Sequence, residues 1–190
     1  MHVFKTLAAA SVLAMAAGGA NAAVYYADSV VGWSDSTKKA ADRSIQSYAL
    51  GSPDGKFYSL GLGGSLTLGF KNAPFHTADV SVFEITFGSG AASGHREAAE
   101  VYAVNSGTGQ EWKLGVLKNT EAGNTVRGAA GSFDQIRLKD VSKTAFTSTS
   151  STDGFDVDSI AIAPVPLPAA GAMLLAGLGG LAALRRRKTA

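Results

Sequence analysis

Residues 79–87 read DVSVFEITF, and the alternation of their side chains indicates a β-strand. Successive side chains of an extended strand point to opposite faces of a sheet. One face of this strand carries Phe83, Ile85 and Phe87, and the other face begins with two valines. Glu84 is the exception, because it shares the valine face. The stretch therefore predicts a strand with one carboxylate on an otherwise apolar face.

Four further stretches show strand-like alternation, and turn residues rich in Gly, Asp and Asn separate them. These strands are expected at residues 65–70, 100–104, 133–138 and 155–162. Only residues 36–48 favour a helix, and the Ser/Thr-rich tract at 147–152 predicts an exposed loop. The pattern predicts an all-β fold, an antiparallel β-sandwich or jelly roll.

The chain has 190 residues, with 17 Lys or Arg, 15 Asp or Glu, and no Cys. This length suits one domain, and the lack of cysteine excludes disulfides, a thiolate nucleophile and a cysteine-based metal site. Five of the basic residues lie near the two ends of the chain, whereas every acidic residue lies between them. The middle region is therefore net acidic, which argues against a nucleic-acid-binding protein.

Residues 1–22 have the three parts of a secretory signal peptide. Lys5 provides the positive start, and an apolar run follows. The small residues Ala20 and Ala22 precede the expected cleavage point before Ala23. Signal peptidase is thus an expected partner, and the folded ectodomain is expected at residues 23–163.

Residues 164–190 begin with a proline-rich motif that contains Val165, Pro166, Leu167 and Pro168. An apolar stretch at 167–184 and a basic tail at 185–188 follow. A membrane-spanning helix needs about 20 apolar residues, so this stretch predicts a marginally short transmembrane helix. The basic tail includes Arg185, Arg186 and Arg187. Basic residues that flank a membrane-spanning helix stay on the cytoplasmic side, so the domain would lie outside the membrane. A permanent membrane anchor is one interpretation of this segment.

The order of motif, apolar helix and basic tail resembles the PEP-CTERM class of sorting signals, in the variant that begins VPLPA. The resemblance implies a bacterial envelope protein whose tail is recognised and cut by an exosortase. It also implies that the membrane holds the chain only before processing. The mature protein would then reach the cell surface or the extracellular space.

Five stretches of the middle region resemble an ectodomain that recurs in PEP-CTERM proteins; they lie at residues 49–70, 79–87, 98–115, 133–142 and 153–163. The chain departs from the family pattern at residues 77–80 and at residues 105–108, where one carboxylate is missing. The resemblance implies a galactose-binding-like jelly roll, a shape often used for carbohydrate binding or cell-surface adhesion.

Asp156 and Asp158 lie two residues apart on an expected strand, so their charges would repel each other unless a cation neutralises them. Calcium takes six to eight oxygen ligands and is the usual neutralising ion outside the cell. The candidate ligands of a structural Ca²⁺ are Asp54, Glu84, Glu100, Asp140, Asp156 and Asp158. Two alternatives stay open, namely a solvated face with an ion pair to Arg137 or Lys139, and a catalytic carboxylate pair.

Nucleophilic catalysis has little support, because His76 and His95 lie in polar, loop-like stretches and no nucleophile-elbow motif occurs. We therefore assign no catalytic residue. Trp33 and Trp112 are candidates for stacking on sugar rings. Trp112 is at least as well suited to filling one end of the sandwich.

The sequence thus favours a secreted, non-enzymatic protein, a structural or adhesive component associated with exopolysaccharide or a biofilm matrix. The alternative is a secreted hydrolase that acts on polysaccharide through paired carboxylates. A concave cleft with Asp156, Asp158, Glu84 or Asp140 about 5–10 Å apart would favour the hydrolase.

Overall fold

The computed structural model describes residues 23–37, 39–85, 94–121 and 124–164. The expected signal peptide lies outside these residues, as does the expected sorting tail except for Pro164, which pairs with Ala78 in the sheet. Within the described ranges, no helix is long and apolar enough to cross a membrane.

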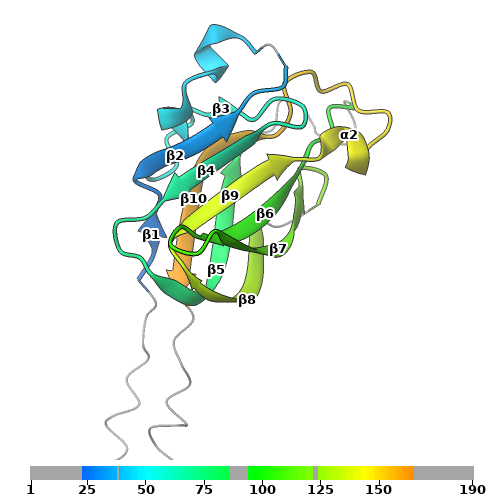
Figure 1. The fold of residues 1–190 in the computed structure, drawn as a ribbon. Coiled ribbons are helices and arrows are strands. Elements are labelled where there is room, and N and C mark those ends of the chain that lie inside the picture. Colours follow the sequence, from blue (N-terminus) through cyan, green and yellow to red (C-terminus); the bar gives the residue numbers. More distant parts are fainter. Residues whose placement is uncertain (1–22, 38, 86–93, 122–123, 165–190) are drawn as a thin grey trace, which may run out of the picture. The chain divides into compact units, whose positions relative to one another are not determined.

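The described residues form two five-stranded antiparallel sheets, which pack face to face (Figure 1). The first sheet has the order β1–β10–β5–β8, with β3 also paired to β10. Its strands are β1 (Tyr25–Tyr26), β3 (Tyr58–Ser59), β5 (Phe75–Glu84), β8 (Thr125–Phe133) and β10 (Asp156–Pro164). The second sheet, in spatial order, contains β2 (Ser29–Ser34), β4 (Ser65–Gly69), β9 (Gln135–Asp140), β6 (Ala98–Asn105) and β7 (Gln110–Lys118). The predicted all-β sandwich is confirmed.

The core lies between the two sheets, and alternate residues of each strand supply it. The second sheet contributes branched side chains that are fully buried, among them Leu66, Leu68, Ile136 and Leu138. The first sheet contributes four side chains that are also fully buried, namely Val80, Val82, Ile160 and Ile162. Glu84 ends β5 on the face that Val80 and Val82 begin. The carboxylate that looked unusual in the sequence therefore lies where the apolar core stops.

Two glycines of β8 let β7 approach closely from the other sheet. A β-carbon at Gly131 would lie 2.7 Å from Cζ2 of Trp112, and one at Gly128 would collide with Leu114. Because both large side chains fill these spaces, the two sheets are joined along one side of the sandwich.

Both described chain ends lie at one end of the sandwich, because Tyr25 of β1 pairs with Ile162 of β10. Long connections gather at the opposite end, which we call the loop end (Figure 1). They include residues 141–155, which contain α2 (Ser142–Ala145).

The helix expected at residues 36–48 is wrong. In the described part of the connection between β2 and β3, the helical structure consists of two short 3₁₀ turns, η1 (Ala41–Arg43) and η2 (Gln46–Ala49). Neither turn has a side-chain N-cap hydrogen bond. Short helices need such caps or an apolar face to pack, and this polar stretch supplies little of either.

Asp140 ties two loops together at the loop end, namely the β3–β4 turn and the connection at residues 141–155, which it bonds at both of its ends. Its Oδ1 accepts hydrogen bonds from the Gly63 N–H (2.9 Å) and the Ser142 N–H (3.2 Å). Its Oδ2 accepts from the Ser142 hydroxyl (2.6 Å) and the Phe155 N–H (2.9 Å). Gly154 has a φ of +73°, and a β-carbon there would lie 2.8 Å from Asp140 Oδ2. The carboxylate therefore takes the place of backbone pairing where the strands end.

Replacement of Asp140 by Ala should lower the free energy of unfolding by about 2–4 kcal/mol, because buried N–H donors lose their acceptor. Asp134→Ala is the matched control, because its carboxylate also accepts an N–H bond and a hydroxyl bond, but at the exposed Ser106. Urea denaturation measures both variants. Equal losses in the two would contradict the assignment of Asp140 as the residue that ties the loops.

Candidate functional site

Acidic side chains from several strand ends converge at the loop end, just beyond the apolar core. Glu97 immediately precedes β6, Asp156 begins β10, and Asp153 lies in the preceding loop. Glu97 and Asp156 are both 0% exposed, and Asp153 is 6% exposed. Charged side chains are rarely buried to this extent without compensating partners. The cluster formed by His95, Glu97, Asp153 and Asp156 is called the acidic cluster below.

Two side chains contact the same oxygen, Oε1, of the Glu97 carboxyl group. The His95 Nε2 lies 2.9 Å from Oε1, and the Ser151 hydroxyl donates to the same oxygen at 2.7 Å. The other oxygen, Oε2, is buried and has no hydrogen-bond partner in the described part of the chain. Asn119 fixes the backbone here, because it accepts from the Glu97 N–H (2.8 Å) and donates to the His95 carbonyl (3.1 Å).

Asp156 and Asp153 have different partners. The Ser59 hydroxyl donates to Asp156 Oδ1, whereas the buried Oδ2 has no hydrogen-bond partner among the residues described. Asp153 forms an ion pair with the Arg43 guanidinium group. The Arg43 side chain is 29% exposed, so water reaches it from one side.

The pKa values of two carboxyl groups reflect this crowding. Burial, and next the nearby charge of Asp156, raise the pKa of Glu97 to about 9. Burial also raises the pKa of Asp156 to about 7, although the Ser59 hydrogen bond opposes the change. Glu84 and Asp153 raise the pKa of both groups. The site therefore favours either bound protons or a bound cation.

The Ser/Thr-rich tract at residues 147–152 is a loop with four exposed residues, as the sequence predicts, but Thr149 and Ser151 are buried in it. Thr149 is 7% exposed and Ser151 is 1% exposed. Thr149 bonds with both backbone groups of Arg96, and Ser151 donates to Glu97. Hydroxyl groups are used here because they satisfy buried backbone and carboxyl groups that have no strand partner.

The six residues predicted as calcium ligands do not all meet at one place. Asp140 ties the loops, and Asp156 belongs to the acidic cluster. Glu100 lies on the outer face of β6, where it pairs with Lys113 (2.6 Å). Asp158 accepts from the N–H groups of Asp54 (3.1 Å) and Gly55 (3.1 Å), while the Asp54 side chain pairs with Lys56. Glu84 ends β5.

Asp156 and Asp158 are not on a solvated strand face, because they are 0% and 4% exposed. A bulge between Val157 and Ser159 falls at Asp158, so the two carboxyl groups meet different partners. Arg137, which the sequence offered as a counter-ion, forms its ion pair with Glu111 instead.

A pocket of about 490 Å³ opens at the loop end, and we call it the loop-end pocket. Phe83 is among its apolar walls, and its polar and charged lining consists of Glu84, Asp158, Asn119, Asn124, Lys118 and Glu121. Asn119 also holds the His95–Glu97 backbone, so the pocket adjoins the acidic cluster. Planar carboxyl and amide groups around an apolar wall can hydrogen-bond a polyhydroxylated ligand and cover its apolar face.

A second pocket of about 510 Å³ lies at the opposite end of the sandwich, where Asp28, Lys71 and Gln135 contribute to its lining. The two tryptophans line neither pocket. Trp33 on β2 is 55% exposed, so its ring is available to a ligand. Trp112 packs against the core and against the position of Gly131, as in the alternative that assigns it to filling the sandwich.

Sequence reasoning missed several residues of the site, among them Glu97, Arg43 and Ser151, and set His95 aside as a turn residue. A charged residue directly before the apolar strand at 98–104 was the available signal for Glu97. Nothing local pointed to its contact with Ser151, because 54 residues separate the two in the chain.

Comparison with known proteins shows the fold. No protein-family model matches the chain, and no curated protein matches it. Among solved structures, a pectin-binding carbohydrate-binding module matches with a TM-score of 0.50 and 12% identity, over 74% of this chain and 95% of that one. CBM32-3 from a family 31 glycoside hydrolase of Clostridium perfringens matches with a TM-score of 0.50 and 11% identity, over 78% and 98%. The chain therefore has the β-sandwich fold of these modules.

In the presence of a chelator, the free energy of unfolding should fall as the pH rises from about 5 to about 9. The ordinary pKa of a glutamate side chain is 4.5, and the pKa of Glu97 in the fold is about 9. The contribution of Glu97 to the free energy of unfolding is therefore full below pH 4.5 and lost above pH 9. Asp156 lowers the free energy of unfolding in the same way as the pH rises from 3.8 to about 7. Urea midpoints at pH 5.5, 7.5 and 9.5 measure the effect.

Glu97→Gln should flatten this pH dependence, whereas the control Glu100→Gln should keep it, because Lys113 lowers the pKa of Glu100. Midpoints of the unmodified chain that stay constant or rise toward pH 9 would show that Glu97 is ionised in the fold.

Proposed function

We propose that this chain is an exported, non-enzymatic protein of the bacterial envelope that binds extracellular polysaccharide. The observation that carries the proposal is the loop-end pocket, with carboxyl and amide groups beside the Phe83 ring. The sandwich fold, which carbohydrate-binding modules also have, is consistent with it.

The lining of the loop-end pocket suits a sugar. A pyranose ring presents hydroxyl groups at its edge and C–H groups on its faces, so it needs planar polar partners and an apolar surface. Glu84 supplies an acceptor, Asn124 supplies an amide group, and Phe83 supplies a ring. A volume of about 490 Å³ falls within the range of small-molecule sites.

The position of the pocket supports a role at the cell surface. Both described chain ends lie at one end of the sandwich and the pocket lies at the other. If the tail at residues 164–190 holds the protein for an exosortase, a partner can reach the pocket from the side away from the attachment. An adhesive or matrix protein needs this accessibility.

The carboxylates favour binding over hydrolysis. Of the four residues that would form a hydrolase site, only Glu84 and Asp158 line the pocket. Asp158 is occupied by two backbone N–H groups, and Asp140 holds the loops. Asp156 is fully buried. A glycosidase requires two carboxyl groups that both reach the bond to be cleaved.

Polysaccharide binding should depend on the loop-end pocket. Using exopolysaccharide purified from the native host as the probe, Asn124→Ala should weaken binding at least tenfold, because the pocket loses an amide group. Gln135→Ala in the opposite pocket is the matched control and should bind normally. Affinity electrophoresis measures both.

Binding by Asn124→Ala at the normal strength would exclude the loop-end pocket as the sugar site. Release of reducing sugar ends by the unmodified chain, with loss of that release in Glu84→Gln, would show a hydrolase instead.

Processing at both ends is tested separately, by mass spectrometry of the mature protein from its host. We expect a chain that begins at Ala23 and ends near residues 165–168, because signal peptidase and exosortase would cut there. A mature chain that retains the basic tail at residues 185–188 would indicate a permanent membrane anchor.

A further inference from the structure

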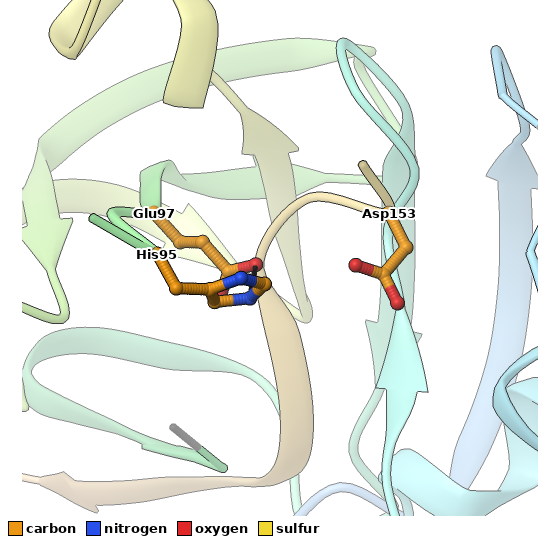
Figure 2. Close-up of side chains that lie close together, drawn as sticks. All are labelled: His95, Glu97 and Asp153. Atoms are coloured by element: carbon orange, nitrogen blue, oxygen red, sulfur yellow. Dashed lines mark ion pairs between the residues drawn. The ribbon is translucent and has the colours of Figure 1, made fainter. Parts of the chain in front are cut away.

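Three potential metal ligands from two separate segments meet in the acidic cluster. The donor atoms of His95, Glu97 and Asp153 all lie within 4.8 Å of one another. Figure 2 shows the His95 ring beside the Glu97 carboxyl group, with Asp153 reaching toward them from another part of the chain. Glu97 and Asp153 are buried, and His95 is half-buried.

Unpartnered oxygens provide an independent observation. Glu97 Oε2 and Asp156 Oδ2 are buried without a hydrogen-bond partner in the described ranges, and both side chains are 0% exposed. A buried carboxylate oxygen without a hydrogen-bond partner destabilises the folded state, and a bound cation would offset this loss. Arg43 is paired with Asp153, and its positive charge also acts on Asp156. One guanidinium group leaves an excess of negative charge in the cluster.

We propose that His95, Glu97 and Asp153 bind a divalent metal ion of the zinc class. The choice follows from the donors, because an imidazole nitrogen suits Zn²⁺ and related ions, whereas Ca²⁺ prefers oxygen ligands alone. Ligands of zinc lie about 2.0–2.2 Å from the ion, so neighbouring donor atoms are about 3 Å apart. The His95 Nε2 and Glu97 Oε1 atoms, 2.9 Å apart, already have this spacing.

Surrounding groups hold these ligands in place, as in natural metal sites. Ser151 donates to Glu97 Oε1, and Asn119 bonds with the backbone of both His95 and Glu97. A metal ion here would connect the segment before β6 to the loop before β10. It would therefore stabilise the loop end beside the pocket without taking part in sugar binding.

The test is thermal unfolding of the tag-free full-length chain in detergent, after treatment with EDTA and dialysis. A saturating concentration of ZnCl₂ should raise the melting temperature by about 5 °C or more, because the ion binds only the folded state. Equilibrium dialysis should find one Zn²⁺ per chain. An equal excess of CaCl₂ should produce no comparable rise.

Variants locate the site. His95→Gln and Glu97→Gln should lose the zinc-dependent rise, and the matched controls His76→Gln and Glu100→Gln should keep it. Glu97→Gln keeps the shape of the side chain and removes its charge, so a urea midpoint in EDTA verifies that this variant folds. No zinc-dependent rise, a rise that His95→Gln retains, or a rise with Ca²⁺ alone would each overturn the proposal.

Discussion

Burial of carboxyl groups at the loop end is the constraint on which the rest of the structure depends. Removing a charged carboxylate from water is costly unless hydrogen bonds or opposite charges compensate. The chain uses several compensations, namely backbone N–H groups for Asp140 and Asp158, and a guanidinium group for Asp153. Glu97 and Asp156 each keep one buried oxygen without a hydrogen-bond partner among the described residues, so their burial is only partly compensated.

These groups connect the core to the loop-end pocket. The apolar core ends at Glu84, and the long loops beyond it have few strand partners. Carboxyl and hydroxyl groups therefore replace the missing backbone pairing, as Asp140 does for two loops and Ser151 does beside Glu97. Asn119 belongs both to this polar interior and to the wall of the loop-end pocket. The same network thus fixes the shape of the surface that we assign to polysaccharide.

Much of the sheet structure could be predicted from the sequence, because alternation is a local pattern. The strands expected near residues 65–70, 100–104 and 155–162 correspond to β4, β6 and β10. The candidate site could be predicted only in part. Glu84 and Asp156 stood out from their apolar neighbours, but Glu97 and Ser151 meet only through folding. The bulge at Asp158 also depends on the partner strand, so the alternation in β10 could not reveal it.

The protonation state of Glu97 tests the central claim most directly. Selective ¹³C labelling of glutamate carboxyl groups gives a simple spectrum, because the chain contains five glutamates. With metal ions chelated, the resonance that disappears in Glu97→Gln should titrate near pH 9 and report a neutral carboxyl group at pH 7. A titration midpoint near the ordinary value of 4.5 would show that the buried carboxylate is ionised and would contradict the account.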